Sequence, residues 1–430
     1  MRNAEADGQR LHPLSPVFRM RPVLSIIVVL FANRASRQPH QGNGFVTAYP
    51  LIVGLIVVAG GVISWIVTLW RIEDGVLRIE SGLLRRSSRR FPPDQLQAVD
   101  TVKPLIARIF GLAEVRVRMA AATGSAARLA YLREADADAL RARLLALAHG
   151  VAEHTPEPPE RPLVRVDTGR LIGSILVSAP MLFLAVVIVV LVVTAALAPS
   201  SAAGVLAGLA GPIFAAVTMA WRYFNGHSGQ SVAEAPDGLR VRTGLLQTAS
   251  ETIPYRRVQA ARLVQPLVWR PLGWCRLQIE VAGKQRSRRE NSSVSMTQRT
   301  LLPVGTLAEA FWLLSRIMPD IPPPGEQPPR RALLKTPLRY HYLSWNYDAV
   351  YAVSTSGRIR RVTDWVPLAK VQSVRLVEGP VQRRLGLATV HLDTAGRNIH
   401  VAARDRDASE CSRIMDELPR ACRSARLPAR

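Results

Sequence analysis

Two long stretches without a charged residue restrict the possible structure of this chain more than any other feature. They cover residues 45–70 and residues 171–221. A helix of about 20 apolar residues crosses the ~30 Å hydrocarbon core of a bilayer, so the first stretch is long enough for one span. The second is interrupted near its middle by "APSSAAG", whose proline, serines and glycine predict a turn between two helices. We therefore predict a transmembrane hairpin over residues 171–222.

The segment before residue 45 has a shorter apolar run, "PVLSIIVVLFAN", at residues 22–33. This run is too short to span a bilayer unaided. Two interpretations stay open: a spanning helix that begins earlier, with Arg19 and Arg21 reaching toward the interface, or a helix that lies along the membrane surface. If the run crosses, residues 11–70 form an N-terminal membrane hairpin and the chain has four spans.

Basic residues at the ends of the apolar stretches predict the orientation. Arg71 directly follows the first stretch and Arg222 directly follows the second, whereas the turn near Pro199 has no basic residue. Arginine and lysine next to spanning helices favour the cytoplasmic side. The sequence thus predicts a multi-pass protein of the plasma membrane with cytoplasmic polar segments.

The polar segments contain the same ungapped pattern three times. Each copy has a glycine ten residues before a proline, followed by a glutamine, an arginine and a second glycine at five, sixteen and nineteen residues after it. These positions are Gly82, Pro92, Gln97, Arg108 and Gly111; Gly244, Pro254, Gln259, Arg270 and Gly273; and Gly357, Pro367, Gln372, Arg383 and Gly386.

Most of the recurring residue types are typical of structural roles. We expect the glycines to supply positive φ at turns and the prolines to start strands where no ladder donor is needed. The glutamines are expected to tie a loop to backbone groups. The recurring arginine leaves two roles open, an ion pair with an internal acid or a contact with a phosphate.

Each copy has a β pattern followed by a helical one. Apolar and polar residues alternate around the first glycine, which is typical of a hairpin with one buried face. The alternation continues in "LAEVRVRM", "WCRLQIEV" and "LATVHLDT". Helical patterns with an acid or threonine suited to capping follow at residues 134–148, 306–318 and 407–418. This order predicts a small barrel or paired sheets with an end-capping helix.

The run Ser/Thr-Gly-x-aliphatic, then Pro-x-x-x-aliphatic-Gln, then Arg-x-aliphatic-Gly resembles the YdbS-like PH domain, a bacterial pleckstrin-homology-like module. The resemblance implies an α+β membrane protein: transmembrane hairpins plus three PH-like domains, each with two β-sheets and a C-terminal helix. It supplies no catalytic residues. The third copy lacks a convincing hairpin before it. We expect PH-like domains at residues 71–150, 223–318 and 333–420, with proline-rich linkers at 151–170 and 319–332.

The charge of the chain favours anionic partners. It carries 56 Lys and Arg against 32 Asp and Glu, a formal net charge of +24, which suits acidic headgroups or phosphate backbones. Two basic clusters are candidate sites for lipid or partner binding. They are Arg85, Arg86, Arg89 and Arg90, and Lys284, Arg286, Arg288 and Arg289.

Motifs for catalysis are weak. The segment "NGHSGQS" lacks the second glycine of a nucleophile elbow, and neither a P-loop nor a metal-ligand set is present. We therefore expect no cofactor, no small-molecule substrate and no catalytic residue. The leading hypothesis is a non-enzymatic membrane scaffold whose domains bind one another, other proteins or acidic lipid. Binding of nucleic acid and an unrecognised membrane enzyme are the alternatives.

Overall fold

The structure is a computed structural model in which the chain forms two compact units, described here one at a time. Unit 1 comprises Met1–Pro158 with Leu246–Glu251, and unit 2 comprises Pro159–Leu245 with Thr252–Arg430. The predicted N-terminal membrane hairpin lies almost entirely outside the described residues. The described residues are 9–10, 63, 69–73, 76–81, 87–91, 96–119, 127–148, 160–235, 238–245, 248–282, 298–396 and 398–427.

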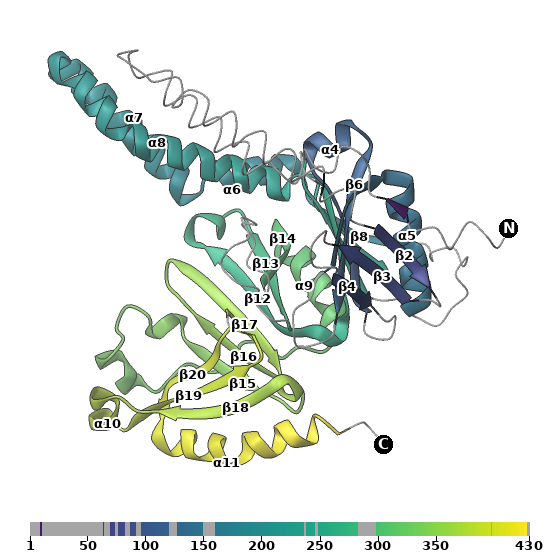
Figure 1. Cartoon of the computed structure of the whole chain (residues 1–430). Coiled ribbons are helices and arrows are strands. Elements are labelled where there is room, and N and C mark those ends of the chain that lie inside the picture. Colours follow the sequence, from purple (N-terminus) through teal and green to yellow (C-terminus); the bar gives the residue numbers. More distant parts are fainter. Residues whose placement is uncertain are drawn as a thin grey trace, which may run out of the picture. The chain divides into compact units, whose positions relative to one another are not determined.

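Unit 1 contains the first repeat as two antiparallel sheets and a closing helix (Figure 1). The apolar stretch ends earlier than predicted, because residues 69–70 already belong to a strand of the first sheet. The predicted strand "LAEVRVRM" and the predicted helix at residues 134–148 are both confirmed. The first sheet has the order β1 (Gln9–Arg10), β2 (Leu69–Glu73), β3 (Val76–Ser81), β4 (Ser87–Phe91). The second contains β5 (Leu96–Lys103), β6 (Leu112–Met119) and β7 (Ala127–Arg133), with α4 (Leu105–Ile109) and α5 (Glu134–Ala148). Unit 1 also holds the start of β11 (Thr248–Ile253), which pairs with β5.

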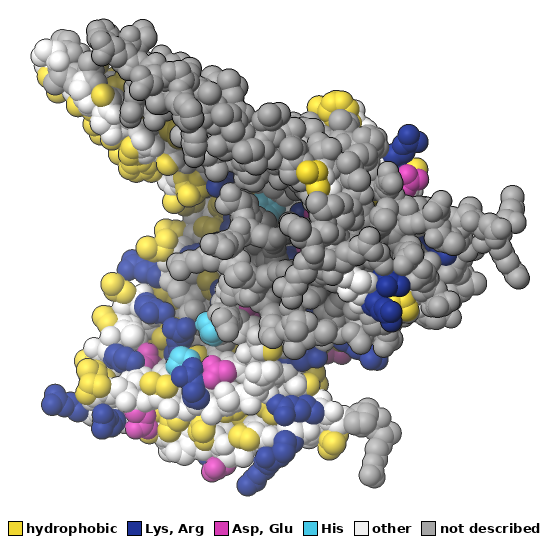
Figure 2. Space-filling view, in the orientation of Figure 1, with side chains coloured by type: hydrophobic (Ala, Val, Ile, Leu, Met, Phe, Trp, Pro, Cys, Tyr) yellow, Lys and Arg dark blue, Asp and Glu magenta, His cyan; other side chains and the backbone are white. Residues whose placement is uncertain are grey.

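Three helices follow the first strand of unit 2: α6 (Thr168–Leu176), α7 (Ala179–Leu197) and α8 (Pro199–His227). Helices α7 and α8 run side by side, with apolar side chains along their surface (Figures 1 and 2). In each helix, only 6% of the most apolar 18-residue window is buried inside the protein. Both helices are long and apolar enough to cross a membrane.

The start of the predicted hairpin is corrected by α6. The Asp167 side chain caps this helix by accepting a hydrogen bond from the Gly169 amide (3.0 Å). Leu171 is fully buried in the core of unit 2, and Ile175 packs against the same core. Leu171 and Ile175 thus belong to a globular core, and α6 is a separate helix before the hairpin.

The second repeat has one sheet of β8 (Arg161–Arg165), β9 (Ser231–Ala235) and β10 (Gly238–Thr243). Its other strands are β12 (Val258–Pro266), β13 (Trp274–Val281) and β14 (Gln298–Thr306), closed by α9 (Leu307–Ile317). Strand β13 matches the predicted "WCRLQIEV". The linker predicted for residues 151–170 is corrected, because residues 161–165 pair as β8 and residue 168 begins α6.

The third repeat follows the short helices η4 (Arg330–Leu334) and η5 (Tyr340–Tyr342). The described residues 298–343, directly before its first strand, contain no helix of spanning length, as the sequence predicted. Helix α11 lies along one face of the β18–β20 sheet (Figure 1). The strands are β15 (Ser344–Tyr347), β16 (Tyr351–Ser356) and β17 (Arg360–Pro367), then β18 (Val371–Val377), β19 (Leu387–Thr394) and β20 (Val401–Asp407), with α10 (Pro380–Leu385) and α11 (Ala408–Ser424).

The second and third repeats share one six-stranded sheet, in the order β14-β13-β12-β17-β16-β15. Trp365 of β17 is 1% exposed and packs in the same core as Leu277 of β13 and Leu313 of α9. On the other face, Val366 packs with Val390 of β19 and residues of α11. The sequence boundary between domains 223–318 and 333–420 therefore does not divide the core, since β17 contributes to both.

The second glycine of every repeat has the same backbone conformation. Gly111, Gly273 and Gly386 have φ of 64°, 64° and 62°, so the predicted positive φ is confirmed at these positions. Gly357 also has positive φ (95°), and a Cβ there would overlap the carbonyl oxygen of Arg360.

We predict that Gly273→Ala lowers the free energy of unfolding by about 1–2 kcal/mol, the cost of a left-handed conformation for a residue with a Cβ. Space around Gly273 is open, so no clash adds to this cost. Gly357→Ala should cost more because the backbone must also move. Denaturant unfolding of the detergent-solubilised chain measures both. Equal losses would contradict the clash at Gly357.

Candidate anion-binding surface at the β12–β17 tip

Two turns, one from the second repeat and one from the third, lie side by side where β12 ends and β17 begins. The strand pair finishes with Pro266 opposite Arg360. The amide of Leu267 then donates a hydrogen bond to the carbonyl oxygen of Ile359 (2.7 Å). We call residues 267–272 and 357–360 together the β12–β17 tip.

The tip exposes large apolar side chains. Leu267, Val268 and Leu272 are 53%, 47% and 50% exposed, and Ile359 is 74% exposed. Water-exposed apolar groups gathered at one place on a surface mark sites for partners or membranes. The tip is therefore a candidate interaction surface.

Arginines accompany these apolar side chains. The Arg270 guanidinium donates to the carbonyl oxygen of Arg358 (2.6 Å) and lies over the ring of Tyr342 at 5.7 Å. Burial, followed by repulsion from Arg276 and Arg262, lowers the pKa of Arg360. Positive charge is thus crowded beside the exposed apolar groups, which favours an anion at this position.

The tip adjoins the end of α8. The Arg276 guanidinium lies over two rings, 5.2 Å from that of Tyr223 in α8 and 5.3 Å from that of Trp269 in the tip. Its Nε also donates to the carbonyl oxygen of Pro303 (3.3 Å). These contacts fix the tip next to the point where the apolar part of α8 gives way to the second repeat.

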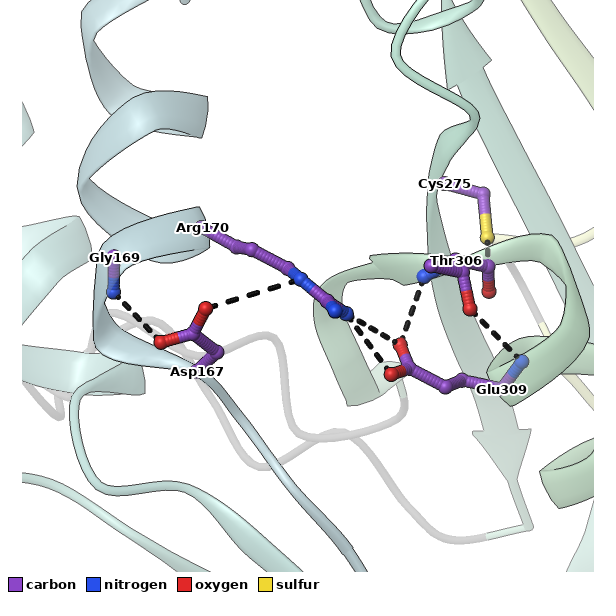
Figure 3. A network of polar contacts seen from close by, with 6 residues as sticks. All are labelled: Asp167, Gly169, Arg170, Cys275, Thr306 and Glu309. Carbon is purple, nitrogen blue, oxygen red and sulfur yellow. Dashed lines mark hydrogen bonds and ion pairs between the residues drawn. The ribbon is translucent and has the colours of Figure 1, made fainter.

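A second set of polar contacts joins α6 to α9 (Figure 3). Arg170 donates to both carboxylate oxygens of Glu309 (2.9 and 3.1 Å). Glu309 accepts from the amide of Thr306 (2.8 Å), and the Thr306 hydroxyl accepts from the amide of Glu309 (3.2 Å), which completes a capping box. Burial opposes ionisation, but the hydrogen bonds from Thr306 and Arg170 outweigh it and lower the pKa of Glu309. The helices and the second repeat are thus firmly connected.

Basic side chains continue from the tip along the junction of the two repeats. Burial and then repulsion from Arg339 lower the pKa of Arg404 on β20. Burial and then repulsion from Arg404 lower the pKa of His391 on β19. Figure 2 shows Lys and Arg side chains beside histidine in the region that Figure 1 labels β17 and β20.

One acid beside these basic side chains, Asp364, is engaged by an arginine. Arg262 donates to both carboxylate oxygens of Asp364 (2.6 and 2.9 Å) across the β12–β17 pair. Burial raises the pKa of Asp364, although Arg262 acts in the opposite direction.

The basic clusters singled out from the sequence are placed only in part. Arg85 and Arg86, and the cluster from Lys284 to Arg289, lie outside the described residues. Arg89 and Arg90 lie on β4, where the Arg90 side chain is exposed. Binding by these clusters stays a prediction.

The recurring residues of the repeat fall into several places. Of the three arginines, Arg270 belongs to the tip, while Arg108 and Arg383 are exposed in α4 and α10. The side-chain amide of Gln259 donates to the carbonyl oxygen of Arg257 (3.3 Å), which fits the predicted link between a loop and the backbone. Gln372 is exposed, and the Gln97 side chain lies outside the described ones.

The role predicted for the prolines is wrong at the two described positions. Pro254 follows the last residue of β11, and Pro367 is the last residue of β17. Each precedes a single turn of 3₁₀ helix that leads to the next strand. Fixed φ at the corner between two sheets explains the residue type better than strand initiation does. Pro92 and Gly82 lie outside the described residues.

Sequence reasoning missed the apolar part of the tip. The segment "QPLVWRPLG" contains three of its four apolar residues and also Trp269, which is 3% exposed. Composition does not separate the buried member from the exposed ones. The two prolines around an apolar run were the available signal, since they exclude a regular helix or ladder there.

Comparisons with known proteins agree with the three-repeat organisation. The model of a family described as "Bacterial PH domain" matches residues 24–148, 179–317 and 331–420. A relative in Bacillus subtilis (strain 168), "UPF0699 transmembrane protein YdbT", is 25% identical over 120 residues, which are 27% of this chain. The match spans 24% of that protein's length. No solved structure gives a significant match.

Proposed function

The chain belongs to the bacterial PH domain family, and on that premise we propose that it is a non-enzymatic membrane scaffold whose β12–β17 tip binds acidic lipid headgroups. The observation that carries the proposal is the contact of Arg276 with both Tyr223 of α8 and Trp269 of the tip. It holds a basic, apolar surface at the end of a helix of spanning length.

The dimensions suit a bilayer. Helix α7 has 19 residues, which at 1.5 Å per residue rise about 28 Å, close to the ~30 Å of a hydrocarbon core. The turn between α7 and α8 contains no basic residue, whereas Arg222 and Arg276 lie near the other end of α8. By the bias of basic residues, that end and the tip face the cytoplasm.

Both components of the tip favour a lipid surface. Transfer of the exposed side chains of Leu267 and Ile359 from water into the membrane interface lowers their free energy. Each basic side chain beside an anionic leaflet adds about 1 kcal/mol of binding free energy, and the tip has Arg270, Arg358 and Arg360. The name of the Bacillus subtilis relative, a transmembrane protein, agrees with this placement.

We predict that a nitroxide label at Leu267→Cys or Ile359→Cys enters the bilayer interface when the full chain is reconstituted in nanodiscs. The label should be shielded from a water-soluble relaxant more strongly with phosphatidylglycerol present than in phosphatidylcholine alone. Labelling is specific because the native thiols are buried, and burial raises the pKa of Cys275 and Cys411 to about 12.

The matched control is a label at Leu334→Cys, an apolar side chain of η4 that is 77% exposed. It should stay accessible in both lipids. Changing Arg270, Arg358 and Arg360 to glutamine should remove the difference between the lipids at the tip. Tip labels that are equally accessible in both lipids, or shielded only by added oligonucleotide, would contradict lipid binding.

A further inference from the structure

Neighbouring repeats are joined by strand pairing. Strand β12 of the second repeat pairs antiparallel with β17 of the third. Strand β5 of the first repeat pairs in the same way with β11 of the second. In each junction, the strand after the repeat proline of one copy meets the strand before the repeat proline of the next copy.

The register of the two junctions is the same. Ala261, seven residues after Pro254, lies opposite Trp365, two residues before Pro367. Thr101, nine residues after position 92, lies opposite Ser250, four residues before Pro254. In both junctions, the distance of the first residue after its proline position exceeds the distance of its partner before the next proline by five residues. Register is strongly specified where one face is buried, so the repeat encodes a defined docking geometry.

Two strands, β4 and β18, correspond to the strands that pair in these junctions, but they do not pair with each other. Strand β4 is the first repeat's equivalent of β11 and β17, and it is the outer strand of its sheet. Strand β18 is the third repeat's equivalent of β5 and β12, and it is also an outer strand. Among the described strands, none pairs with either outer edge.

The outer edge of β18 is not protected in the usual way. Natural proteins cover outer strands or give them prolines, exposed charges or inward-pointing charges. Residues 371–377 contain no proline, their one charged side chain, Arg375, is paired with Asp393, and Leu376 and Val377 are 41% and 42% exposed. A strand with exposed apolar side chains and no strand partner on its outer side is suited to the addition of another strand.

We propose that copies of this chain associate head to tail, with β18 of one copy pairing antiparallel with β4 of the next. The conserved register places Leu376 opposite Ser88 and Val374 opposite Arg90. Arg375 then faces Arg89, and Asp393, which accepts from Arg375 at 2.6 and 3.1 Å, offsets the like charge. Because the two surfaces differ, the contact is heterologous, and every added molecule brings another β4 and another β18 for the next contact.

The test uses the full chain in liposomes with Ser88→Cys and Leu376→Cys together. Directly opposite residues of an antiparallel pair have Cα atoms about 4.5–5.5 Å apart, within the range of a disulfide. Mild oxidation should give a reducible ladder of dimers and larger species on a gel. The native cysteines are buried and should not contribute.

Three controls separate this geometry from other contacts. Chains with one substitution each should give dimers when the two are mixed and none when each is alone. Ser88→Cys with Val374→Cys is two residues out of register and should lose most of the ladder, since such diagonal neighbours are about 7–8 Å apart. Dimers from a single variant alone, or a cross-linked monomer, would overturn the proposal.

A measurement without cross-linking guards against an unreactive thiol pair. Labelled wild-type chains at increasing density in liposomes should give photobleaching traces with several steps. Leu376→Lys with Val377→Lys should reduce them to single steps, because two further positive charges opposite the basic strand β4 oppose strand addition. Wild-type chains that bleach in single steps at every density would also overturn the proposal.

Discussion

Arg262→Met should lower the free energy of unfolding by about 3–5 kcal/mol near neutral pH, because it leaves the carboxylate of Asp364 buried without its partner. Asp364 is 5% exposed, and both its oxygens accept from Arg262. Chemical denaturation of the detergent-solubilised chain, followed by tryptophan fluorescence, measures the loss.

The loss should become smaller as the pH falls. Burial raises the pKa of Asp364, and removal of Arg262 removes an interaction that lowers it. The folded variant therefore binds more protons than the unfolded chain at pH values above the ordinary aspartate pKa of about 3.9. Its stability relative to the wild type consequently rises as the pH is lowered from 7 toward that value.

Two variants control for the location of the charge. Arg262→Met with Asp364→Leu should recover most of the loss, since the pair is then replaced by apolar groups. Arg375→Met removes an exposed pair with Asp393 and should have little effect. A loss for Arg262→Met that does not change with pH would show that Asp364 does not carry the penalty.

Trp365→Ala should cost about 3–5 kcal/mol, the usual range for removal of a buried tryptophan. The ring packs edge to face with Phe311 at 6.2 Å, and its Nε1 donates to the carbonyl oxygen of Pro322 (3.2 Å). Because β17 belongs to the third repeat while Trp365 packs in the core of the second, both repeats should be destabilised together.

Hydrogen exchange can verify this coupling. Amides of β13 in the second repeat and β16 in the third should both exchange faster in Trp365→Ala. Trp312→Ala is the matched control, since this side chain of α9 is 42% exposed and its loss should cost within about 1 kcal/mol. Faster exchange in only one repeat would mean that the repeats unfold independently.

Strands and helices of the repeats were predictable because their patterns are local. Strand β19 coincides with "LATVHLDT", and α9 begins after Thr306, the residue predicted to cap it. The ends of the hairpin could not be predicted, because apolar residues such as Leu171 suit a membrane and a protein core equally well. The contacts of α6 with β14 and α9 separate the two environments.

For the candidate site, the sequence predicted only which residue types take part and not how they are arranged. Arg270 was found as a recurring residue with an open role, and the structure places it beside Tyr342 of the next repeat. Such contacts depend on which strands meet across a junction. A single copy of the pattern contains no information on its neighbour, so the shared core and the tip required the three-dimensional structure.

The shared-strand junction also affects how arrays of this kind change in length. Every repeat contributes one strand that precedes its proline and one that follows it, and the described junctions consume one of each. An array of any number of repeats therefore retains two unmatched strands. Gene duplication or deletion of a whole repeat leaves the rest of the architecture complete, whereas loss of half a repeat exposes a buried core.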